Sequence, residues 1–119
     1  MGSTSAKVEV SNAEHQDLRA ELNLLVESGA TYTIIHGDTL RKLQVKPLEE
    51  RTFTLADGRE VKRAMEGVRV SVGERHGFSS VIFGEENDQE LLGVTALEEL
   101  GLELDPVSRQ LKPAQLFML

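Results

Sequence analysis

The chain has 119 residues, a formal net charge of −7 and a pI near 4.9. This length supports one domain with a single core, which must be aliphatic because aromatic residues make up only 4% of the chain. The acidic balance argues against nucleic acid as a partner, and the absence of cysteine excludes disulfides, thiolate catalysis and cysteine-based zinc sites. Without a membrane-length apolar run or a signal-like start, we expect no membrane partner and a cytoplasmic location.

The first third of the chain predicts three short strands. Residues 1–6 are small and polar, and are expected to be a disordered N-terminus or an expression remnant, so that a single domain occupies residues 7–119. Alternating or β-branched runs predict strands at 7–10, 22–26 and 31–35. After the last of these, Asp38 is placed to cap a short helix.

The middle of the chain predicts two hairpins. Strand-like runs occupy residues 52–55, 59–63, 68–72 and 79–83. Asp57-Gly58 joins the first two runs and favours a two-residue type I′ turn. A longer loop over residues 73–77 joins the later pair.

One short helix is predicted near the C-terminus. Thr95 and Glu98 have the spacing of a capping box, and Gly101 is placed to end the helix. Many short strands with only one or two brief helices indicate an all-β fold.

The segment LLVESGATYTII, residues 24–35, carries the chemistry. It places Glu27, Ser28 and Gly29 between two apolar runs. An exposed turn with a solvated carboxylate is the ordinary interpretation of such a triplet. The apolar flanks favour instead a loop near the core, with Gly29 where the backbone approaches another group closely.

This segment resembles the active-site loop of the retroviral-type aspartic proteases (retropepsins) and their single-domain prokaryotic relatives. Two further markers follow in order: FTLADGREVKRAMEGVRVSV resembles the flap hairpin, and Leu91-Leu92-Gly93 with the helix after it resembles the C-terminal marker. The match covers about residues 8–113. The resemblance implies a closed, barrel-like retropepsin fold with one short C-terminal helix.

The resemblance also implies a mechanism. A chain this short carries one such loop, so a two-fold homodimer would supply one carboxylate from each subunit. The two carboxylates would share a proton and activate water against a peptide bond, without a metal or another cofactor. Ser28 would tie the two loops together across the axis, and a peptide or protein substrate would lie under the flaps. The residues expected to bind it are Gly29, Ala30, Leu55, Ala56, Asp57, Gly58 and Arg59.

The chain departs from the family at the residue that matters most. Relatives carry Asp where this chain has Glu27. The extra methylene moves each carboxyl group by about 1 Å, a misplacement that can cost about a hundred-fold in rate. Glu27 therefore marks either a weakened aspartic endopeptidase or a catalytically silent dimer used for peptide binding or assembly. A third interpretation is that Glu27 is an introduced change in an otherwise active protein.

The remaining candidate residues favour structural roles. The three histidines, His15, His36 and His76, lie in separate loops without ligand spacing, so no metal site is expected. The acidic run at residues 85–88 is interpreted as a solvated loop. The apolar C-terminus has two interpretations: packing against its own subunit's core, or a contact across the dimer axis. Its large residues are Leu116, Phe117, Met118 and Leu119.

Overall fold

Strands dominate the computed structural model, which describes residues 3–119. Strands account for 48% of the described residues and helices for 11%, so the prediction of a mainly β domain is confirmed. The strands are β1 Ser5–Ser11, β2 Arg19–Val26, β3 Thr33–His36, β4 Glu49–Thr54, β5 Glu60–Val72, β6 Arg75–Gly84, β7 Leu91–Leu92, β8 Leu102–Leu104 and β9 Leu111–Pro113. The helices are α1 Gly37–Lys42 and α2 Val94–Leu100.

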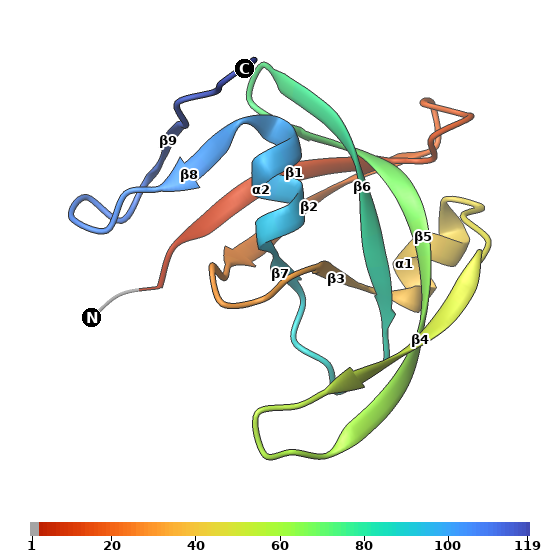
Figure 1. Ribbon diagram of the computed structural model, residues 1–119. Coiled ribbons are helices and arrows are strands. Elements are labelled where there is room, and N and C mark those ends of the chain that lie inside the picture. The colour runs from red at the N-terminus through yellow and green to blue at the C-terminus, as the bar shows by residue number, and fades with distance from the viewer. Residues whose placement is uncertain (1–2) are drawn as a thin grey trace.

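Seven strands form one strongly curved sheet (Figure 1). The hydrogen-bonded order is β1-β2-β7-β3-β6-β5-β4, and β1 also pairs with β5 at the far side of the sheet. The pairings therefore run from β1 around to β5 and back to β1, with β4 attached outside this ring. β8 and β9 form a separate two-stranded hairpin.

The core lies inside this curved sheet. Alternate residues of the strands point inward, as the period of two along a strand requires. On β1 they are Val8 and Val10, and on β5 they are Val68 and Val70, all fully buried. Helix α2 covers one opening of the sheet and contributes Ala96, Leu97 and Leu100 to the same cluster. This packing holds β2, β7 and α2 together, and these elements carry the loop after β2.

The two predicted hairpins exist, but both predicted connections are wrong. Between β4 and β5, Gly58 N–H donates to Leu55 O at 2.9 Å and Leu55 N–H donates to Arg59 O at 2.8 Å. The loop therefore has three residues and ends in Gly58 at φ +89°, instead of forming a two-residue type I′ turn at Asp57-Gly58. One residue with positive φ is enough here because Gly58 forms the bulge that restores the register.

The connection from β5 to β6 is shorter than predicted. Val72 pairs directly with Arg75, so a two-residue turn replaces the expected loop over residues 73–77. The runs at 59–63 and 68–72 also prove to be parts of one thirteen-residue strand, β5. The intervening residues 64–67 do not interrupt the strand, because its partners β4 and β6 hydrogen-bond its two halves.

Both short helices form, but neither uses its predicted N-cap. Helix α1 begins after His36, and Asp38 lies inside its first turn, where its carboxylate accepts a hydrogen bond from Arg41 at 2.8 Å. Helix α2 has Gly93 as N-cap and makes no side-chain capping bond, so the Thr95–Glu98 capping box is absent. Its end is as predicted: Gly101 adopts the left-handed conformation at φ 67°.

The start of the described chain lies beside the C-terminal hairpin, where the Thr4 hydroxyl donates a hydrogen bond to Arg109 O. Strand β1 begins at Ser5, inside the segment expected to be disordered, while residues 1 and 2 lie outside the described residues. At the C-terminus, Leu116 to Leu119 are exposed on this subunit, so packing against its own core is not what the structure shows. Within residues 3–119, every helix is too short or too polar to span a bilayer.

Candidate active site

Backbone hydrogen bonds hold the loop after β2 against the start of α2. Glu27 N–H donates to Leu92 O of β7 at 3.0 Å. Ala30 O and Thr31 O accept from the first two N–H groups of α2, those of Val94 and Thr95, at 2.8 and 2.9 Å. These carbonyls satisfy helix donors that would otherwise need a cap, which is why no capping box is required. The loop and the helix thus form one hydrogen-bonded unit.

The Glu27 side chain folds back over its own loop. Its Oε1 accepts a hydrogen bond from Gly29 N–H at 3.0 Å, and Glu27 O accepts one from Ala30 N–H at 3.2 Å. The carboxylate is therefore positioned by the turn it belongs to. Glu27, Ser28 and Gly29 are all exposed on this single subunit.

The expectation that this loop sits near the core holds only for its flanks. Leu24 and Val26 before it and Thr33 and Ile35 after it are buried. A Cβ on Gly29 would meet only the Glu27 carboxylate, at 3.2 Å, so no backbone from another segment of the chain packs closely against Gly29. The close approach occurs at Gly93, beside Tyr32, because the helix must come within hydrogen-bond reach of the loop.

An apolar cavity of about 280 Å³ separates this loop from the β4–β5 hairpin. The loop side contributes Gly29, Ala30, Thr31 and Tyr32, and the hairpin side contributes Phe53, Thr54, Leu55 and Val61. Ile34, Arg63, Ile82 and Asp88 complete the lining. A cavity of this size with few polar groups suits an extended peptide's apolar side chain.

The structure brings together only some of the predicted substrate-binding residues. Gly29, Ala30 and Leu55 line the cavity. The other four, Ala56, Asp57, Gly58 and Arg59, form the exposed turn of the hairpin and lie outside the lining. In that turn the Asp57 carboxylate accepts hydrogen bonds from Arg59, which lower the pKa of Asp57.

Sequence reasoning missed the residues that form most of the cavity wall. Phe53 and Val61 are direct cross-strand partners and both line the cavity. Their alternation with Leu55 and Arg63 was a usable signal for the inward face of the hairpin. No sequence signal places Tyr32 or Asp88 there, since their positions depend on how distant segments pack.

The most strongly bonded ion pair near the site joins β5 to the loop before β7. Arg63 Nε and Nη2 donate to the two oxygens of Asp88 at 2.7 and 3.1 Å. The Arg63 guanidinium lowers the pKa of Asp88, and Asp88 raises the pKa of Arg63. Asp88 Oδ2 also accepts from Glu85 N–H at 2.7 Å. Residues 85–88, expected to be a solvated loop, are therefore anchored to the sheet through Asp88.

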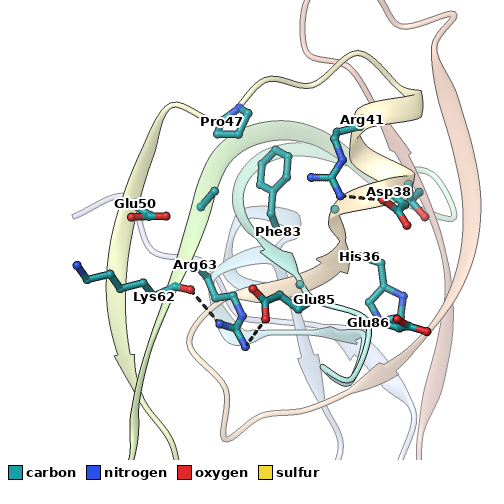
Figure 2. A pocket seen from close by; sticks show the side chains of 14 residues that line it. His36, Asp38, Arg41, Pro47, Glu50, Lys62, Arg63, Phe83, Glu85 and Glu86 are labelled. Atoms are coloured by element: carbon teal, nitrogen blue, oxygen red, sulfur yellow. Dashed lines mark hydrogen bonds and ion pairs between the residues drawn. The ribbon is translucent and has the colours of Figure 1, made fainter.

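A second cavity, of about 500 Å³, lies beside α1 (Figure 2). Two of its cationic side chains have acidic partners: Arg41 bonds Asp38, and Arg63 reaches Glu85 as well as Asp88. Glu27 lines neither this cavity nor the apolar one, but two residues of its loop, Gly29 and Ala30, line the apolar cavity. The charges of the second cavity compensate one another, so it offers no concentrated charge for a ligand, and we place the candidate site at the apolar cavity beside the Glu27 loop.

None of the three histidines lines the apolar cavity, although His36 contacts Asp88, which does. His36 Nε2 is 2.8 Å from Asp88 O, and His76 Nδ1 is 2.8 Å from Ser71 Oγ. His15 is exposed in the loop between β1 and β2. In the described part of the chain, no three His, Asp or Glu residues gather as metal ligands would.

A mainly β domain in which a carboxylate-bearing Glu-Ser-Gly turn faces a projecting hairpin across an apolar cavity has the features of the aspartic protease class. The family described as "gag-polyprotein putative aspartyl protease" matches residues 17–99, well over half of the chain. The chain therefore belongs to this retroviral-type aspartic protease family. A comparison with curated proteins found no match.

Proposed function

We propose that this protein is an aspartic endopeptidase that works as a retropepsin-type homodimer, with Glu27 in the place of the family's aspartate. The observation that carries the proposal is the apolar cavity between the Glu27 loop and the β4–β5 hairpin. The β1–β5 pairing supports a closed, barrel-like retropepsin fold. The three segments that resemble retropepsins favour the single-domain prokaryotic members of that group.

The proposed dimer places Glu27 opposite the partner's Glu27. The exposure of Glu27 and Ser28 on the single subunit supports this arrangement, because a second copy can reach them. Two carboxylates at short range share one proton, so one can act as general base on water while the other donates a hydrogen bond to the scissile carbonyl. Ser28 would link the two loops. No metal or cofactor is needed for this chemistry.

The substrate would lie extended between the loop and the hairpin. Backbone groups of Gly29 and Ala30 would hydrogen-bond its main chain as an added strand. The cavity would take an apolar side chain against Phe53, Leu55 and Val61. The turn from Ala56 to Arg59 would close over the peptide from above.

Cleavage of a denatured protein mixture at pH 4 to 7 tests the proposal. Glu27→Gln should abolish cleavage, because an amide cannot act as a general base. Glu27→Asp should raise the rate if only the reach of the carboxylate limits it. Glu21→Gln changes an exposed glutamate on β2, the strand that leads into the loop, and as the matched control it should leave cleavage unchanged. Cleavage that survives Glu27→Gln would remove Glu27 from the mechanism.

The second candidate is a catalytically silent dimer that binds peptides or supports assembly. The hydrogen bond from Gly29 N–H to the Glu27 carboxylate favours it, because it holds that oxygen within its own loop. Peptide binding without cleavage by either the wild type or Glu27→Asp would support this candidate. Both measurements can be made on the same preparations.

A further inference from the structure

Half of the β4–β5 hairpin projects beyond the sheet (Figure 1). Strand β5 pairs with β6 only from Met65 onward. From Glu60 to Ala64, β5 pairs with β4, which is the edge strand of the sheet. Residues 50–64, which we call the hairpin arm, are therefore held to the sheet at one end. Such a ribbon can open and close at low cost because few contacts must break.

One residue of the active-site segment contacts this arm from across the cavity. The Tyr32 ring meets the Phe53 ring edge-to-face, with centroids 6.3 Å apart at 82°. Arg51 Nη1 donates a hydrogen bond to Tyr32 Oη at 3.0 Å, and its guanidinium carbon lies 5.9 Å from the Tyr32 ring centroid. We call these three residues, Tyr32, Arg51 and Phe53, the clasp.

The clasp is well placed to control the arm. Tyr32 follows the loop that α2 holds through the Ala30 and Thr31 carbonyls, so its backbone is fixed. On the arm, Phe53 lies two residues beyond the base that Arg63 and Asp88 anchor, while Arg51 lies at that base as the register partner of Arg63. Tyr32 and Phe53 both line the cavity, so breaking their contact widens it.

We propose that Tyr32 is a positioning residue that holds the hairpin arm closed over the cavity. The clasp itself is inferred from the contacts described above, whereas its effect on substrate binding rests on the proposed function. Closing the arm narrows the cavity around a peptide without touching the reacting carboxylate. Weakening the clasp should therefore raise KM for a peptide substrate while leaving kcat unchanged.

The chain supplies its own reporter of the clasp. Tyr32 is the only tyrosine, and there is no tryptophan, so protein fluorescence comes from this residue. Arg51→Ala should expose the Tyr32 ring and increase the quenching of its fluorescence by acrylamide. Acrylamide is uncharged, so its access to the ring does not depend on the charge that the substitution removes. Arg59→Ala is the matched control, because Arg59 lies on the same hairpin and pairs with Asp57 at the turn.

Hydrogen exchange provides a second readout that needs no catalysis. Arg51→Ala, which removes the cation, and Tyr32→Phe, which removes the hydroxyl that Arg51 bonds, should speed exchange of arm amides by about two- to ten-fold, the range expected for losing one cation–π or hydrogen-bonded contact. Arg51→Lys should restore part of the protection. Amides of the β1 core at Val8 and Val10 serve as the internal reference and should not change.

The outcomes separate the two proposals. Faster exchange and stronger quenching in Arg51→Ala, absent from Arg59→Ala, support the clasp even if the wild type cleaves no peptide. In that case the proposed peptidase function is rejected and the clasp is retained. Unchanged arm exchange and unchanged Tyr32 quenching in Arg51→Ala overturn the clasp. An increase in exchange rate that is equal in the arm and in the β1 core also overturns the clasp, because such an increase reports a global loss of stability.

Discussion

Gly93 packs directly against the backbone of Tyr32. A Cβ at position 93 would stand 2.5 Å from the Tyr32 carbonyl carbon and 2.6 Å from its oxygen. This contact brings α2 close enough for its first N–H groups to reach the loop carbonyls. The Leu91-Leu92-Gly93 segment therefore builds the candidate site by permitting this approach.

Gly93→Ala should destabilise the fold. The backbone at Gly93 is extended, at φ −95° and ψ 176°, so alanine costs nothing in conformation and the whole effect is steric. We expect a loss of about 1 to 3 kcal/mol in the free energy of unfolding, measured by urea denaturation. Gly67→Ala on β5 is the control, since a Cβ at position 67 would have no neighbour within 4 Å. Equal effects at the two glycines would contradict the steric explanation.

The Arg63–Asp88 pair should make stability depend on pH. The folded pKa of Asp88 lies below its unfolded value, so its contribution is full above about pH 4 and is lost as pH falls through the folded pKa. Asp88→Asn should cost about 1 to 2 kcal/mol at pH 7, the low part of the range for charged hydrogen bonds because both groups retain some water contact.

Urea titrations at pH 7 and near pH 3 check this dependence. The difference between wild type and Asp88→Asn should shrink at the lower pH, since protonation removes the charge that the variant lacks. Asp38→Asn is the control: its pair with Arg41 is exposed, and its loss should have little effect at either pH. A gap for Asp88→Asn that is constant with pH would refute the role of its charge.

Asn12 should prove essential to the loop between β1 and β2. Its amide nitrogen donates to Leu43 O and Gln44 O, and its oxygen accepts from Glu14 N–H and His15 N–H. Asn12→Ala leaves these groups without their partners, so we expect a loss of about 1 to 3 kcal/mol by thermal or urea unfolding. Asn87→Ala removes an exposed asparagine and should be close to neutral.

The exposed C-terminal residues should promote self-association. Phe117 and Met118 are 77% and 96% exposed on the single subunit, which is unfavourable for large apolar side chains unless a partner covers them. A Phe117→Ser, Met118→Ser double variant should dissociate at higher protein concentration than the wild type in sedimentation equilibrium. Leu48→Ser, another exposed apolar position, should not change the dissociation constant. Unaltered self-association in the double variant would place the interface elsewhere.

The local pattern of the sequence predicted most elements of the fold. Alternation in the segment of β1 and the β-branched residues of β3 identified strands, because side-chain period and backbone preference are local properties. Gly101 was correctly identified as the end of α2 for the same reason. The predicted caps at Asp38 and Thr95 were wrong because tertiary hydrogen bonds had already satisfied the start of α2, and Asp38 instead bonds Arg41.

The sequence by itself determined that a carboxylate-bearing turn, Glu27 to Gly29, lies between two buried strands of a small, mainly β domain. Only the tertiary structure decided what surrounds that turn. The contacts of Tyr32 with Phe53, of Arg63 with Asp88 and of Gly93 with Tyr32 join residues between 21 and 61 positions apart. Such contacts depend on strand register and on the curvature of the whole sheet, which no short stretch of residues encodes.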